Sequence, residues 1–146
     1  MRYFIALVSI CLLSCCSKEE IVVHHEGTWY GHLDAHYVSK PEQHIRLDLN
    51  KGRVSISTYF HSYTSGWYDS EGTYSIGSDG IIRFDITMTP SDLFKDNPWI
   101  PIITITHAET AYSDFSGELL KLHFTKELQG EKTSSWIRLG RKRPNL

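Results

Sequence analysis

The chain reads QHIRLDLNKGRVSISTYF over residues 43–60. Apolar and polar residues alternate on both sides of Asn50-Lys51-Gly52, so each half has one apolar and one polar face. Asn and Gly tolerate the positive φ angles that a tight hairpin turn requires. The stretch therefore predicts two half-buried antiparallel strands joined by a short turn.

The same alternation continues along most of the chain, whereas helical periodicity is nearly absent. Turn-forming residues, such as those of Gly77-Ser78-Asp79-Gly80, separate the alternating segments. We predict eight strands, over residues 27–38, 43–50, 52–60, 67–76, 80–88, 100–112, 118–125 and 133–140. Their apolar face is predicted to carry Ile45, Leu47, Leu49, Val54, Ile56, Phe60, Ile82, Phe84, Ile86, Met88, Leu120, Leu122, Phe124, Ile137 and Leu139.

Short links between amphipathic strands favour an antiparallel up-and-down meander, and closure into a barrel removes the exposed edges of the sheet. The predicted fold class is all-β, with an eight-stranded antiparallel up-and-down barrel. Its interior would be wide enough for side chains or for one small ligand. A two-layer sandwich is the alternative that the same pattern permits.

The pairing of the first two strands depends on where they turn. If they turn at Lys40-Pro41, His36 lies opposite His44, Asp34 opposite Arg46 and His32 opposite Asp48. This register predicts a ladder of complementary pairs on the polar face.

The N-terminal segment has the features of an export signal. Arg2 precedes an uncharged, mostly apolar run over residues 4–14. A helix that spans a bilayer needs about 20 apolar residues, so this run is too short for a permanent span. We predict that residues 1–14 are a lipoprotein signal peptide that is cleaved.

The residues after this run resemble a bacterial lipobox, in which a small residue precedes the acylated cysteine. Ser14 before Cys15 fits that pattern best. Cys16 is the rival, because Cys16-Ser17-Lys18-Glu19-Glu20 resembles the acidic start of many Bacteroidetes lipoproteins, which often accompanies surface display. The resemblance implies a lipidated tether over residues 15–26, a domain over residues 27–146, and a cell-envelope location at the outer membrane, with its face left open. The lipid bilayer would be a partner through the acyl chains.

Several classes of function are excluded by composition. The three cysteines all precede residue 17, which excludes a disulfide framework, a thiolate zinc site and a cysteine nucleophile in the domain. A net charge of −2 provides no basic field for nucleic acid. Nucleophile-elbow, phosphate-loop and zinc-protease motifs are absent. The spacing of Glu109, Asp114 and Glu118 supports no acid/base pair. We therefore predict a protein without cofactor that is not an enzyme.

Two motifs at the ends of the domain resemble the lipocalin-like (calycin) barrels. They are Gly27-Thr28-Trp29-Tyr30 in the first strand and Trp136-Ile137-Arg138-Leu139 in the last. The resemblance implies that Trp29 closes one end of the barrel and that Arg138 or Arg141 stacks over it, a cation–π contact worth about 0.5–2 kcal/mol. The chain is also similar to the small lipocalin-like lipoproteins of Bacteroidetes. The first motif resembles the avidin barrels too, although their series of biotin contacts is not located here.

The resemblance implies a barrel that binds a small apolar or amphipathic ligand. The link at 39–42 is shorter than the first loop of typical lipocalins, so the mouth would be open or the interior filled. The alternative is a solid barrel that acts as an interaction or inhibitor module for an envelope protein, with the aromatic loop at 59–68 as the contact. The candidate ligand-binding residues are Trp29, Tyr37, Phe60, Tyr68, Phe84, His107 and Phe124.

A third hypothesis rests on the eight histidines, which suggest zinc or copper binding in the envelope. Its ligands would come from His24, His25, His32, His36 and His44, the last three being the central candidates. The alternation places His32, His36, His44 and His123 on the polar face, which favours solvated histidines over a shielded metal site. His107 follows Ile103 and Ile105 in step, so we predict that it points inward.

Overall fold

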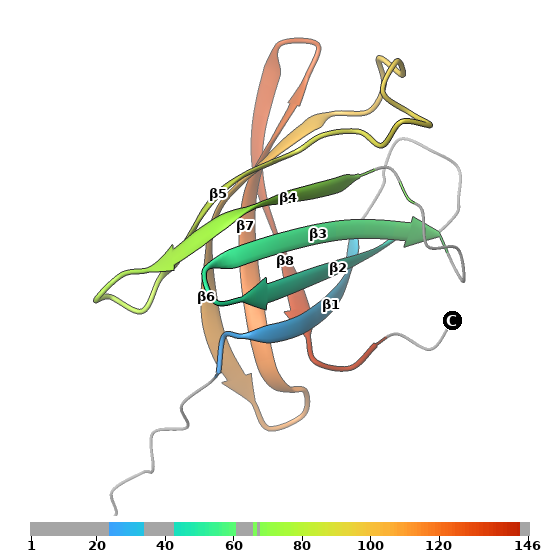
Figure 1. The fold of residues 1–146 in the computed structure, drawn as a ribbon. Helices are drawn as coiled ribbons and strands as arrows, with labels where there is room; N and C mark the ends of the chain where they lie inside the picture. Colours follow the sequence, from blue (N-terminus) through green and yellow to red (C-terminus); the bar gives the residue numbers. More distant parts are fainter. Residues whose placement is uncertain (1–23, 34–42, 61–65, 67, 144–146) are drawn as a thin grey trace, which may run out of the picture.

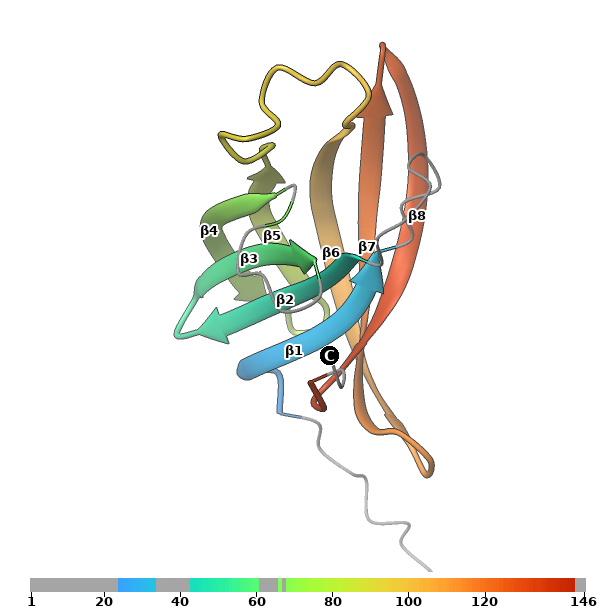
Figure 2. The ribbon, with the colours of Figure 1, turned by 90° about the vertical axis from the view of Figure 1, so that its right-hand side faces the viewer.

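The computed structural model describes residues 24–33, 43–60, 66 and 68–143. They form eight strands, and each strand pairs antiparallel with its neighbours around a closed barrel (Figure 1 and Figure 2). The predicted all-β barrel is confirmed, and the sandwich alternative is wrong because the last strand pairs with the first. The strands are β1 Gly27–Leu33, β2 Gln43–Asn50, β3 Arg53–Phe60, β4 Asp69–Ile76, β5 Ile82–Met88, β6 Ile102–Ser113, β7 Gly117–Leu128 and β8 Glu131–Gly140.

Turn chemistry explains where the strands end. Lys51 and Gly52 adopt φ angles of 48° and 80° between β2 and β3, so the turn forms where it is predicted, with Lys51 in place of Asn50 in the left-handed conformation. Strands β7 and β8 extend beyond their predicted ends and meet at Gln129-Gly130, where φ is 52° and 85°. The sequence did not predict this extension because its residues are mostly polar and show no alternation of apolar and polar side chains. Residues 34–38 of the predicted first strand lie outside the described residues. No helix in the described part of the chain is long and apolar enough to cross a bilayer.

The register predicted for the first two strands is wrong. His32 lies opposite His44, Tyr30 opposite Arg46 and Thr28 opposite Asp48. The pairing is displaced by an even number of residues, which leaves every side chain on its expected face, so the alternation cannot distinguish the two registers. The ladder ends at Leu33 and Gln43, and the chain between them is longer than a tight turn at Lys40-Pro41 requires. Residues Asp34 and His36 lie outside the described residues.

The apolar face of the strands fills the barrel. Fourteen of the fifteen residues predicted for that face are buried or half-buried. The buried ones are Ile45, Leu47, Leu49, Val54, Ile56, Ile82, Ile86, Met88, Leu120, Leu122, Phe124 and Leu139, and the half-buried Phe84 and Ile137 pack against them. The side chain of the fifteenth, Phe60, lies outside the description. Each fully buried aliphatic side chain contributes about 1.5–3 kcal/mol to stability.

A β-bulge changes the alternation in β6. Ile103 and Ile105 point inward, but the next buried residue is Ala108, because Thr106 is an extra residue in the ladder with β7. His107 therefore lies on the outer face, opposite His123. The prediction that His107 points into the barrel is wrong for this reason.

The two ends of the barrel are connected differently. At one end, which we call the Trp29 end, the links cover residues 51–52, 77–81 and 114–116, and the chain enters β1 and leaves β8. At the other end, the loop end, the links cover residues 34–42, 61–68 and 89–101 and the tight turn at 129–130. The β7–β8 hairpin rises above the rest of the barrel at the loop end (Figure 1).

Candidate functional site

Trp29 closes its end of the barrel. Its side chain is fully buried, and its indole N–H donates a hydrogen bond of 2.8 Å to the carbonyl of His25. The Arg141 guanidinium lies over the ring, 3.6 Å from its centroid. Arg141 thus occupies the position that the resemblance left open between two arginines. Arg138 lies instead over Trp136, at 5.5 Å, since both alternate onto the outer face of β8.

Arg141 also holds the chain as it enters the barrel. Its Nε donates to Glu118 Oε2 at 2.7 Å, its Nη1 donates to the Glu26 carbonyl at 2.8 Å, and its Nη2 donates to the carbonyl of His24. The hydrogen bond from Arg141 lowers the pKa of Glu118 below its ordinary value. One cation therefore joins the N-terminal segment, β7 and the buried indole, which is a structural role.

The interior leaves little surface for a ligand beside the predicted residues. Trp29, Tyr68 and Phe124 are at most 2% exposed, so other side chains surround them closely. Phe84 is half-buried and packs against the core. His107 lies outside the barrel, and both Tyr37 and the side chain of Phe60 lie outside the described residues. These residues were expected to line a hollow interior. Core side chains instead pack around each of the candidate residues that the structure describes inside the barrel.

The aromatic loop is only partly described. Tyr68 is buried, and its hydroxyl donates a hydrogen bond of 2.7 Å to the Pro101 carbonyl. Burial raises the pKa of this hydroxyl. Tyr59 is also buried and stacks on His44, with ring centroids 5.3 Å apart. The expectation of exposed aromatic contacts is wrong for these two residues, and residues 61–65 and 67 lie outside the description.

A hollow of about 430 Å³ lies at the loop end, beyond the packed core. The inward positions of β7 change there from Leu122 and Phe124 to Lys126 and Leu128. The ammonium of Lys126 lies 5.4 Å from the centre of the Phe124 ring. The hollow is lined by Pro101, Lys126, Leu128, Gln129, Glu131, Thr133 and Ser135.

The chemistry of this lining suits an amphipathic molecule. Pro101 and Leu128 offer apolar surface, while Lys126, Thr133 and Ser135 offer hydrogen-bond donors. A second hollow, of about 540 Å³, is lined by Asp48, Asn50, Arg53, Val54, Ser55, Glu71, Gly72 and Thr73. That hollow has three charged side chains, Asp48, Arg53 and Glu71, and its one aliphatic residue, Val54, is only 2% exposed, so the hollow at the loop end is the better candidate for a ligand with an apolar part.

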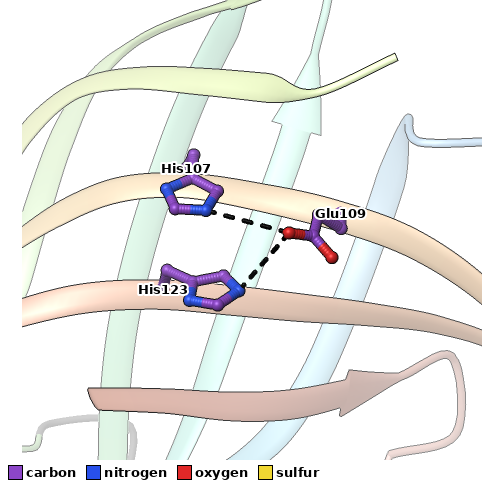
Figure 3. A group of neighbouring side chains, drawn as sticks. All are labelled: His107, Glu109 and His123. Carbon is purple, nitrogen blue, oxygen red and sulfur yellow. Dashed lines mark ion pairs between the residues drawn. The ribbon is translucent and has the colours of Figure 1, made fainter. Parts of the chain in front are cut away.

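A second constellation lies on the outer wall, where His107, Glu109 and His123 come together from β6 and β7 (Figure 3). Glu109 Oε1 is 3.9 Å from His107 Nε2 and 3.7 Å from His123 Nε2. The two imidazoles are stacked, with centroids 4.2 Å apart and an angle of 9° between the rings. Burial lowers the pKa of His123, and His107 and Lys121 lower it further, whereas Glu109 opposes the shift.

Sequence reasoning missed this constellation because it assigned His107 to the wrong face. The spacing of the apolar residues contained a signal: Ile103 and Ile105 are two apart, but the next apolar residue, Ala108, is three further on. An interval of three between inward-facing residues of a strand indicates a β-bulge, after which the side chains that would have pointed inward point outward. Glu109 and His107 then share the outer face with His123. Glu118 lies at the Trp29 end, where Arg141 binds its carboxylate.

The histidines expected to bind metal are only partly brought together. His32 and His44 are paired across β1 and β2, with centroids 5.5 Å apart. His44 is buried at 7% exposure, not solvated as predicted, because Tyr59 covers it. His24 and His25 lie at the Trp29 end beside Arg141 and Tyr74, and His36 lies outside the described residues.

No family model matches the chain, and comparison with curated proteins and with solved structures gives no match either. The lipocalin-like resemblance therefore stays a prediction that rests on two motifs and on the barrel architecture.

Proposed function

We propose that this chain is a lipid-anchored envelope protein whose barrel binds a small amphipathic molecule at its loop end. The observation that carries this proposal is the hollow of about 430 Å³ where the inward face of β7 and β8 continues past the core. A ligand there would lay its apolar part against Pro101 and Leu128 and its polar part toward Lys126 and the hydroxyls of β8. Because the interior is packed, the proposed site is the mouth of the barrel and not its centre.

The proposed role is binding without catalysis. Among the residues that the structure describes, the ionisable side chains of the hollow are Lys126 and Glu131, and no histidine lines it that would activate Ser135 or Thr133. One cation and one carboxylate beside the apolar surface of Pro101 and Leu128 favour a ligand with a strongly polar head group and a hydrocarbon body.

The proposed anchor is the acylated Cys15 or Cys16 after a cleaved signal peptide of residues 1–14. His24 follows Cys15 by nine residues, a reach of at most about 30 Å. His24 and Glu26 are held by Arg141 at the Trp29 end. A tether from that end would keep the Trp29 end toward the bilayer and leave the mouth facing away, accessible to ligand.

The binding proposal is tested by native mass spectrometry of the chain purified from its own cell envelope, before and after unfolding. We expect the folded protein to carry a molecule that is lost on unfolding. Ser135→Trp, which fills the hollow, should lose the carried molecule, whereas Ser134→Trp, whose side chain lies on the outer face of the same strand, should keep it. An identical mass before and after unfolding of the unaltered chain would contradict the proposal.

The anchor is tested separately by labelling cells with palmitate. Cys15→Ser should abolish labelling if Cys15 is acylated, and Cys16→Ser should abolish it if Cys16 is the site. Labelling that survives in both variants, or that is missing from the unaltered chain, would overturn the anchor and leave the binding proposal standing.

A second candidate function follows from exposed apolar side chains at the loop end. Leu93, Trp99 and Ile102 are 74%, 64% and 50% exposed on and beside the link over residues 89–101. Clustered exposed apolar residues often mark a contact with another protein. A partner protein recovered by crosslinking at Trp99 in cells, together with an unchanged native mass, would favour this function over ligand binding.

A further inference from the structure

The outer wall of the barrel carries a set of side chains whose types and positions suit a metal ion. His107 and His123 lie opposite each other on β6 and β7, and Glu109 follows His107 on the same face (Figure 3). One ligand atom from each of the three side chains lies within 4.8 Å of the other two. We propose that His107, Glu109 and His123 bind a divalent transition-metal ion of the zinc and copper class.

The distances are close to those of a formed site. Zinc binds imidazole nitrogen and carboxylate oxygen at about 2.0–2.2 Å, which places tetrahedral ligand atoms about 3.3 Å apart. Glu109 Oε1 stands 3.9 Å from His107 Nε2 and 3.7 Å from His123 Nε2, so each of these two pairs needs to close by about half an ångström. The ligand atoms of the two histidines lie within 4.8 Å of each other and need to close by at most about 1.5 Å. The imidazoles must also rotate about χ2 out of their parallel stack, and both side chains are partly exposed, at 36% and 23%.

A supporting hydrogen bond selects the correct tautomer of His107. The Thr106 hydroxyl donates its only proton to the His123 carbonyl, at 3.0 Å. The same oxygen lies 3.1 Å from His107 Nδ1, so in that contact it accepts and Nδ1 carries the proton. The lone pair of neutral His107 is then on Nε2, the atom that faces Glu109. Ligating histidines usually have such a partner on their second nitrogen.

The other ligand nitrogen is available as well. His123 Nε2 is buried and makes no hydrogen bond within the described part of the chain. A buried imidazole nitrogen without a partner is costly, and coordination of a metal ion would satisfy it. The bulge at Thr106 produces the whole arrangement, because it turns His107 to the outer face and places the threonine hydroxyl against its ring.

The charged neighbours leave the site accessible to a cation. Arg83 lies opposite His107 on β5, but its guanidinium is bound to Asp79 at 2.6 Å. Lys121 lies opposite Glu109 on β7, and its ammonium is placed over the Trp136 ring, 5.1 Å from the centroid. Two imidazoles and one carboxylate leave one tetrahedral position open for water or for a side chain of another molecule. Imidazole ligands favour zinc, copper and nickel over magnesium and calcium, which prefer oxygen.

Isothermal titration of the full chain with zinc chloride tests the proposal. We expect one saturable site, with no comparable binding of magnesium. His123→Gln and Glu109→Gln should each weaken binding by at least about 100-fold, since loss of even a supporting group costs about 10–100-fold. Thr106→Val keeps the β-branched shape and should weaken binding about tenfold. His32→Gln, an exposed histidine of β1, is the matched control and should bind zinc like the unaltered chain.

Copper provides a local readout. Trp136 lies opposite His123 on β8, so copper bound at the proposed site should quench its fluorescence. Trp136→Phe should remove that quenching while titration still detects the site. If His123→Gln does not fold, as judged by circular dichroism, Glu109→Gln and Thr106→Val decide the question, because both side chains are exposed. Absence of saturable zinc binding, or zinc binding of unchanged affinity in both Glu109→Gln and Thr106→Val, would overturn the proposal.

Discussion

The Trp29 end and the loop end of the barrel are built from the same strands but differ in almost every respect. At the Trp29 end the links are short, and the Arg141 guanidinium stacks over a buried indole and donates a hydrogen bond to the Glu118 carboxylate. At the loop end three of the links are long, and the inward side chains of β7 become Lys126 and Leu128 around a hollow. One end therefore has the features of a structural closure and the other those of a recognition surface.

The contrast indicates where substitutions can be made. Short turns and a fully buried plug leave the Trp29 end little freedom to relax, so changes there should affect stability. Long links and half-buried side chains let the loop end change with little effect on the fold. The following predictions compare the two ends, starting with the largest expected effect.

Trp29→Ala should lower the free energy of unfolding by about 3–5 kcal/mol, because it leaves a large cavity beneath Arg141. Urea denaturation followed by circular dichroism measures this change. Trp136→Ala is the control, since Trp136 is 48% exposed on the outer face and its loss should cost less than about 1 kcal/mol. Equal losses in the two variants would show that Trp29 does not close the barrel.

Arg141→Met should lower the free energy of unfolding by about 2–3 kcal/mol, through loss of hydrogen bonds to a carboxylate and to two carbonyls. Arg138→Met, which removes an outer-face cation, is the control and should cost well under 1 kcal/mol.

The Arg141→Met variant also tests how the stability of the fold depends on pH. Arg141 lowers the pKa of Glu118 in the folded chain, so the stabilisation is present above the ordinary carboxyl pKa and is lost as the pH falls through the lowered value. The stability difference between the unaltered chain and Arg141→Met should therefore be largest near neutral pH and should shrink under acid conditions. A difference that stays constant from neutral pH to about pH 3 would contradict the ion pair.

Gly31→Ala should lower the free energy of unfolding by about 1–3 kcal/mol. Gly31 pairs with Leu139 where β1 meets β8, and a Cβ atom there would lie 2.3 Å from Leu139 Cδ2 and 2.8 Å from the Arg138 carbonyl. The two strands share only two paired positions among the described residues, so this contact closes the barrel. Thermal unfolding measures the effect, and Gly130→Ala in the β7–β8 turn, where φ is 85°, tests whether backbone strain alone gives a comparable loss.

Leu128→Ala should change the free energy of unfolding by less than about 1 kcal/mol, because the side chain lies beyond the core at the loop end. Leu122→Ala, six residues nearer the Trp29 end on the same face of β7, should cost about 2–5 kcal/mol. Comparison of the two in urea tests whether the packed core ends between these positions. A loss of several kcal/mol for Leu128→Ala would show that the hollow is part of the core.

The alternation of residues was enough to predict antiparallel strands with one apolar face, because each strand buries every second side chain. The choice of a barrel over a sandwich was settled by the pairing of β8 with β1. Ile45, Leu47 and Leu49 are buried as expected, and Asn50-Lys51-Gly52 forms the turn that its residue types favour. Trp29 is the buried residue of the first strand, with one of the two expected arginines over it. These features depend on local chemistry or on a motif, so the sequence contains them directly.

The candidate sites depend on relations between strands that no single stretch contains. His32 pairs with His44 in the observed register. The predicted register would put every side chain on the same face as this one does, so the alternation could not distinguish them. His107 meets His123 because one extra residue at Thr106 reverses the alternation within β6. The sequence alone therefore determined which segments are strands and which face of most of them is apolar. Only the tertiary structure decided the register, the filling of the interior and the group of His107, Glu109 and His123, because these depend on how neighbouring strands align.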